Sequence, residues 1–115
     1  MKTRYVTEMG MGTDVHGRDY TQAAERAVFD AIHHSSLQFF APLNKTADDM
    51  FIDLLIGVPE PDLVDKDRVA AALPYGTVSI TVVKGGLEIP SDDGTDAIVI
   101  ANAGIIVRLS DSNHS

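Results

Sequence analysis

The chain has 115 residues, of which 44% are hydrophobic and 23% charged, with a formal net charge of −8 at pH 7. This length and composition fit a single folded domain and argue against general disorder. The acidic charge argues against nucleic acid as a partner, because phosphate backbones are repelled. No cysteine is present, which excludes disulfides and thiolate ligands. No apolar run approaches the roughly 18 residues of a membrane span, so we expect a cytoplasmic protein with no membrane partner.

A strand and a helix are expected in the first part of the chain. Residues 4–13 alternate with the period of a strand. Asp19 can then cap a helix, with Gln22 as its capping-box partner, and small apolar residues recur at helical spacing. The helix should end near residues 35–36. A connection over 37–50 follows, and a brief helical turn is one interpretation of part of it.

Three further stretches of the chain are expected to form strands. A short helix is expected between the first two of these strands, with Asp65 as its cap. It should end at Pro74, because proline disfavours the helical conformation of the preceding residue. The last strand is apolar on both faces, which predicts a central position in the sheet. These strands are expected at 51–58, at 77–83 with an extension over 84–89 through a glycine bulge, and at 97–109.

The order β-α-β-α-β-β predicts an α+β domain over residues 1–109, with a four-stranded mixed sheet and the helices packed on one face. Residues 110–115 are expected to form a frayed polar tail. Two helices cannot cover both faces, so Ile98, Ile100 and Ile106 should be buried by sister subunits. We therefore expect a homo-oligomer, either a trimer or a multiple of trimers.

The segment from Gly10 to Gly17 is the first candidate for chemistry. In an extended strand Asp14 and His16 share a face with Gly10 and Gly12, whose missing side chains let a ligand or a neighbouring backbone approach closely. An Asp-x-His pair can bind zinc, manganese or iron, or act as a general base oriented by a carboxylate. Alternatively, both side chains satisfy backbone groups in the strand-to-helix turn that Gly17 permits.

Three other polar residues are candidates for the same site. His34 could join a metal site only across a subunit boundary, because a helix about 20 Å long separates it from Gly17; otherwise it is a charge at the helix C-terminus. Glu88 follows paired glycines and could add a carboxylate, or the stretch is a bulge leading into an acidic hairpin loop. Asn102 lies in an apolar strand and is expected to be buried, where its amide fixes register or lines a polar pocket.

Four segments together resemble a small family of bacterial and plant hypothetical proteins called "Lin". They are Gly10-x-Gly12-x-Asp14-x-His16-Gly17, residues 72–76, residues 85–90 and residues 98–103. The resemblance covers nearly the whole chain and implies family membership without an established activity.

The Gly-x-Asp-x-His stretch is also similar to one in methylerythritol cyclodiphosphate synthases. In those trimers the aspartate and histidine bind a divalent metal at a subunit interface, and the fold is chorismate-mutase-like. This similarity implies a chorismate-mutase-like fold here, with Asp14 and His16 as metal ligands. The sequence lacks the second histidine motif and the nucleotide-binding segment of the synthases, so from their site only the metal is carried over, and the fold class agrees with the order β-α-β-α-β-β.

Two hypotheses follow for the function. In the first, Asp14 and His16 are the catalytic or metal-binding residues of an oligomeric enzyme or small-molecule-binding protein, with zinc or manganese at a subunit interface. Glu88 and Asn102 would then contact the ligand. In the second, the protein is a non-catalytic ligand-sensing or oligomerisation module, in which the same residues fix subunit register. Fold analogy cannot choose between them.

Overall fold

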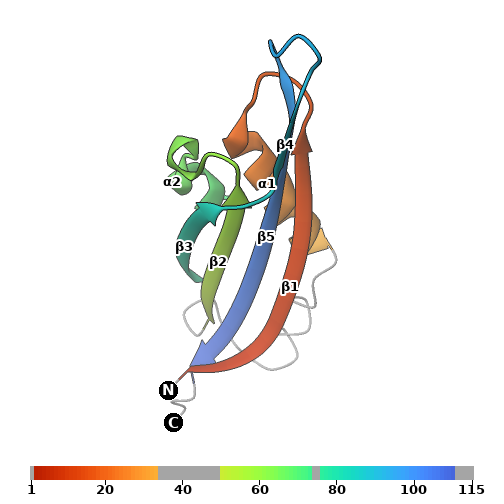
Figure 1. The fold of residues 1–115 in the computed structure, drawn as a ribbon. Helices are drawn as coiled ribbons and strands as arrows, with labels where there is room; N and C mark the ends of the chain where they lie inside the picture. The colour runs from red at the N-terminus through yellow and green to blue at the C-terminus, as the bar shows by residue number, and fades with distance from the viewer. Residues whose placement is uncertain (1, 34–49, 74–75, 111–115) are drawn as a thin grey trace.

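The computed structural model describes residues 2–33, 50–73 and 76–110. They form one mixed sheet with helices on one side of it (Figure 1), which confirms the α+β class. The chorismate-mutase-like topology remains a prediction. In chain order the elements are β1 (Lys2–Asp14), α1 (Tyr20–His33), β2 (Met50–Val58), a 3-10 turn (Pro61–Leu63), α2 (Lys66–Ala70), β3 (Thr77–Lys84), β4 (Leu87–Pro90) and β5 (Ala97–Ser110).

β5 is the central strand, as the apolar stretch 97–109 predicted. On one side it pairs antiparallel with β1 along almost its whole length. On its other side it pairs antiparallel first with β4 and then with β2. β2 also pairs in parallel with β3, so β1 and β3 are the two edges. β2 and β4 thus lie in line along one side of β5.

The expectation of four strands, with 84–89 as a bulged extension of the third, is wrong. The chain leaves β3 at Gly85, whose N–H donates to the Val58 carbonyl at 2.8 Å. Gly86 then has a φ of +63°, and a Cβ on it would overlap the carbonyl oxygen of Ile100. Only glycine fits this position, because a side chain would clash and the left-handed backbone is strained for other residues. The glycine pair therefore moves the chain onto a fifth strand, β4, beside β5.

Helix α1 lies directly on β1 because two strand residues have no side chain. A Cβ on Gly12 would overlap backbone atoms of Ala23 and Ala27, and a Cβ on Gly10 would overlap those of Ala27 and Ala31. The three alanines are fully buried. The sequence predicted that either a ligand or a neighbouring backbone approaches these glycines closely. In the structure it is the backbone of α1. The space above Gly10 and Gly12 is taken up by the helix.

The core lies between the helices and the inner face of the sheet. Val78, Ile80 and Val82, alternate residues of β3, are partly buried against it. Asp65 caps α2 by accepting the Arg68 N–H at 3.1 Å, but the helix ends at Ala70. The predicted stop at Pro74 lies outside the described residues, and so does the predicted connection over 37–50 except for Met50, which begins β2. Within the described part, no helix has both the length and the apolar character needed to cross a membrane.

The opposite face of the sheet is covered by no helix in the described part of the chain (Figure 1). Cross-strand pairing places alternate residues of β1, β2, β3 and β5 on this face, which we call the open face. Ile98 is exposed there, and Ile100 and Ile106 are half-buried. The central strand therefore has a second apolar face, as predicted. Within the described part of the subunit, no other element covers the apolar residues on this face.

Candidate functional site

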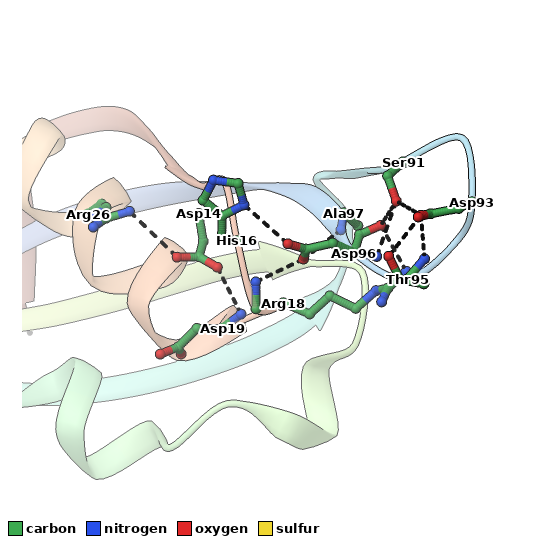
Figure 2. Close-up of polar contacts among 11 residues, drawn as sticks. Asp14, His16, Arg18, Asp19, Arg26, Ser91, Asp93, Thr95, Asp96 and Ala97 are labelled. Carbon is green, nitrogen blue, oxygen red and sulfur yellow. Dashed lines mark hydrogen bonds and ion pairs between the residues drawn. The ribbon is translucent and has the colours of Figure 1, made fainter.

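The chain changes direction at the end of β1 and separates the two residues of the Asp-x-His pair. The strand ends at Asp14, and the backbone then bends through Gly17, which has a φ of +88°, and Arg18, with a φ of +50°. Asp14 lies beneath α1 and is 4% exposed, whereas the His16 side chain is 85% exposed. The expectation that both share one face is wrong, because the extended conformation does not continue beyond Asp14 (Figure 2).

Asp14 anchors the start of α1. Its Oδ2 accepts the backbone N–H of Asp19 at 3.0 Å, and its Oδ1 lies 3.7 Å from Nη1 of Arg26. Asp19 is the helix N-cap, as predicted, because its Oδ1 accepts the Gln22 N–H at 2.9 Å. In a capping box the residue at the Gln22 position bonds the N–H of the cap. Here Asp14 accepts that N–H, so its carboxylate is engaged inside the subunit.

His16 is held by a carboxylate from the other end of the chain. Its Nδ1 lies 3.1 Å from Oδ2 of Asp96, the residue before β5. The second oxygen, Oδ1, accepts the N–H groups of Gly17 and Ala97, both at 2.8 Å. These bonds, that of Gly17 first, then that of Ala97 and then that of the His16 ring, lower the pKa of Asp96. The carboxylate that orients His16 is therefore Asp96 and not Asp14.

Sequence reasoning missed Asp96 because it treated the loop before the last strand as ordinary turn chemistry. A signal existed in the strand pairing. The β1 and β5 register runs to Asp14 opposite Val99, and its continuation places Gly17 opposite Asp96. A correct alignment of the two long strands would have brought this carboxylate to the Gly10–Gly17 segment.

Glu88 joins the same end of the molecule from β4. One of its oxygens accepts from Nε of Arg18 at 3.0 Å, and the other accepts the Tyr20 hydroxyl at 2.6 Å. Arg18 also donates from Nη2 to the Asp96 carbonyl at 3.3 Å. The Tyr20 bond, followed by the Arg18 bond, lowers the pKa of Glu88. Glu88 is thus bound to Arg18 and Tyr20, two residues that closely follow the Gly10–Gly17 segment.

The loop between β4 and β5 is closed by its own side chains. Oδ1 of Asp93 accepts the Thr95 N–H at 3.0 Å and lies 2.8 Å from the hydroxyls of both Thr95 and Ser91. The Thr95 backbone bond, then the Thr95 hydroxyl, then the Ser91 hydroxyl lower the pKa of Asp93 to about 2. The Ser91 hydroxyl in turn accepts the Asp96 N–H at 3.2 Å. This network holds Asp96 in place beside His16 (Figure 2).

A hollow of about 320 Å³ opens next to His16, and we call it the tip hollow. Its walls are mostly apolar. The polar residues among them are His16, Ser91 and Asp96. The lining residues are Val15, His16, Ile89, Pro90, Ser91, Asp96, Ala97 and Ile98.

The remaining predicted site residues lie elsewhere. The expectation that Asn102 is buried is wrong: its side chain is exposed on the open face, where Met11 and Gly57 flank it on the neighbouring strands. It faces outward because the alternation of β5 puts even-numbered residues on this side. His34 lies outside the described residues. His33 is exposed and stacks on Phe29 with ring centres 5.9 Å apart.

The described residues contain no group of three or more histidine, aspartate or glutamate side chains placed to hold a metal ion. Asp14 and His16 bind separate partners, so within one subunit they do not form a shared pair of ligands. Of these two residues, only His16 has a side chain that is exposed to solvent. A zinc or manganese site remains a hypothesis that needs ligands from beyond the described residues of one subunit.

The sequence matches a family described as "Conserved hypothetical protein (Lin0512_fam)" over residues 4–107. A similar solved structure is that of an FtsZ-like protein of unknown function from Nostoc punctiforme PCC 73102. It is 35% identical, with a TM-score of 0.82, over 96% of this chain and 98% of that chain. A comparison with curated proteins gives no match. The chain belongs to the Lin0512 family of conserved hypothetical proteins.

Proposed function

We propose that this protein is the subunit of a homo-oligomer that assembles through the open face of its sheet. The distribution of exposed apolar side chains carries this proposal. The described residues include ten exposed large hydrophobic side chains, and all except Phe29 and Leu63 lie on the open face or at its tip end. Large exposed apolar patches are uncommon on monomeric proteins and mark interaction sites. These eight are Met9, Met11, Val15, Leu55, Val83, Leu87, Ile89 and Ile98.

The centre of the open face has a shape that suits a second copy of itself. Met9 and Leu55 flank Gly104 on the two neighbouring strands. Met9 is 76% exposed and Leu55 is 43% exposed, whereas a Cβ on Gly104 would meet no atom within 4 Å. The Met9 and Leu55 side chains therefore project on either side of an unfilled gap at Gly104. This gap lies in a shallow hollow of about 300 Å³, which we call the central hollow. A flexible methionine from another copy is well suited to fill such a gap.

The charges of the molecule also favour a second copy. The central hollow has no charged side chain in its lining, although the chain as a whole has a net charge of −8. Beside the hollow, Asp53 is neutralised by Arg108, whose Nε lies 3.0 Å from its Oδ2. Two acidic subunits can therefore bring these faces together without bringing their excess charge together. An anionic lipid surface would instead require a basic patch.

Asn102 lies in the central hollow and contributes to this argument. An amide both donates and accepts hydrogen bonds, so it can pair with its own copy near a symmetry axis. The amide would then set subunit register, as the sequence suggested for a buried asparagine. By similarity to the trimeric synthases, we expect three subunits or a multiple of three.

Paired variants test this proposal by analytical ultracentrifugation. Leu55→Lys places a charge in the proposed interface, and Leu63→Lys places the same charge on an apolar residue that is 64% exposed away from it. We expect the wild type and Leu63→Lys to sediment at about three times the 12.4 kDa subunit mass or a multiple of it. Leu55→Lys should sediment as a folded 12.4 kDa monomer, checked by circular dichroism.

Met9→Lys provides a second interface variant, because a side chain that is 76% exposed tolerates replacement in the folded subunit. A wild type that remains at 12.4 kDa at micromolar concentration would overturn the proposal. So would interface variants that sediment like the wild type. Oligomers that are not multiples of three would correct the subunit number and leave the interface in place.

A further inference from the structure

We propose that the tip hollow binds a small organic amine, with the ammonium group at His16 and an apolar body against the walls. This site is distinct from the Asp14 and His16 pair suggested by the sequence, because Asp14 is turned away beneath α1. It uses atoms of one subunit at the tip end of the open face, and its walls include none of the residues that line the hollow at the centre of the proposed interface.

The first argument is the hydrogen-bonding state of His16. A carboxylate only accepts, so the Asp96 oxygen 3.1 Å from Nδ1 fixes the ring hydrogen on that nitrogen. In the neutral imidazole Nε2 is then an acceptor with a fixed orientation. The side chain is 85% exposed, so Nε2 is accessible to a ligand. A ligand that binds there must offer a hydrogen-bond donor.

The second argument is the apolar wall of the hollow. Val15, Ile89 and Ile98 are 52%, 51% and 39% exposed, and together with Pro90 they form its sides. A volume of about 320 Å³ is at the lower limit of ordinary ligand pockets. The hollow therefore fits a compact apolar group, about the size of one aromatic ring.

The third argument is charge. The hollow is bordered by the loop that carries Asp92, Asp93 and Asp96, whereas the nearby Arg18 is already paired with Glu88 at 3.0 Å. Negative charge therefore predominates around the acceptor nitrogen, and a cationic donor is favoured over a neutral one. An anionic ligand is disfavoured by the same carboxylates. The acceptor, the walls and the charge together specify an amine with an apolar body.

Three probes of equal size and different charge test the site. Benzylamine, benzyl alcohol and benzoate are titrated into ¹⁵N-labelled protein at about pH 8, where benzylamine is a cation and benzoate an anion. The backbone amides of Gly17 and Ala97 report binding, since both donate to Asp96 beside the hollow. We expect saturable shifts with benzylamine, weaker binding of benzyl alcohol and no binding of benzoate.

Variants then assign the site. His16→Ala removes the acceptor and should weaken benzylamine at least about tenfold, the effect of losing one hydrogen bond to a charged group. Asp96→Asn places an amide donor opposite Nδ1, which moves the ring hydrogen to Nε2 and should weaken it similarly. His33→Ala, a change in the other described exposed histidine, should leave the affinity unchanged.

Several results would overturn the proposal. They are benzoate binding as tightly as benzylamine, no saturable shift with any probe, and wild-type affinity in His16→Ala. If the Asp96→Asn variant loses its loop structure, His16→Ala alone decides, since its side chain is 85% exposed and has no role in the core. A wild-type protein that sediments as a monomer and still binds benzylamine would support the site even where the assembly proposal had failed.

Discussion

The His16 imidazole and the Asp96 carboxylate lie 3.1 Å apart, although 80 positions separate them in the sequence. The antiparallel pairing of β1 with β5 brings them together, because the end of β1 and the start of β5 meet at the tip of the sheet. On the other face of β1, α1 packs closely on Gly10 and Gly12, and the start of α1 is anchored by Asp14.

The contact between Gly12 and α1 predicts a costly alanine substitution. A Cβ at Gly12 would overlap the Ala23 carbonyl oxygen, a backbone atom that cannot move without shifting the helix. We expect Gly12→Ala to lower the free energy of unfolding by about 1–3 kcal/mol or more, measured by urea denaturation. Both changes are made in the Leu55→Lys background, which is expected to be monomeric, and Gly104→Ala is the matched control in the same sheet because its Cβ meets no atom of the subunit within 4 Å. Equal stability of the two variants would contradict the close-packing account.

The anchoring role of Asp14 predicts an effect on stability that metal does not mediate. Asp14→Ala leaves the Asp19 N–H without its acceptor and should lower the free energy of unfolding by about 1–3 kcal/mol. Asp14→Asn keeps a carbonyl acceptor and should lose less. Both are measured by urea denaturation with and without a chelator. If Asp14 instead binds zinc or manganese with His16, elemental analysis finds stoichiometric metal in the wild type that is lost in Asp14→Asn and in His16→Ala.

The buried Tyr20 predicts a loss of stability in strong base. Burial, and then its hydrogen bond to Glu88, raise the pKa of Tyr20 from 10.0 to about 12. The native state therefore favours the protonated phenol more than the unfolded chain does. The resulting stabilisation is complete below pH 10 and is lost as the pH rises through about 12. Unfolding free energies measured across this range should fall less steeply for Tyr20→Phe than for the wild type. Identical pH dependence in the two proteins would contradict this.

Much of the fold could be predicted from local patterns in the sequence. The capping pattern at Asp19 and the continuous apolar runs at 51–58 and 97–109 located α1, β2 and the central β5. The change of strand at Gly85 and Gly86 could not be predicted in this way, because it depends on where β2 ends. A paired glycine is compatible with both a bulge and a crossing until the neighbouring strand is known.

The sequence correctly predicted where the candidate site lies in the chain. It did not predict which residues bind Asp14 and His16. Local spacing pointed to the segment that contains Asp14 and His16, and that segment does lead into the tip hollow. Strand alternation wrongly predicted that these two side chains act together, because it assumed an extended chain through residues that bend. The pairing of His16 with Asp96 depends on a strand register across 80 positions, which no local pattern contains.

The most direct test of the central claim asks whether the open face is covered in solution. Methyl-labelled methionines report on it, since Met9 and Met11 are 76% and 54% exposed in the single subunit and Met50, at 5%, is a buried reference. The NMR signals are recorded with a soluble paramagnetic agent, which broadens exposed methyl groups. We predict that Met9 and Met11 are protected almost as well as Met50. Strong broadening of Met9 and Met11, with Met50 unaffected, would show an uncovered face and contradict assembly through it.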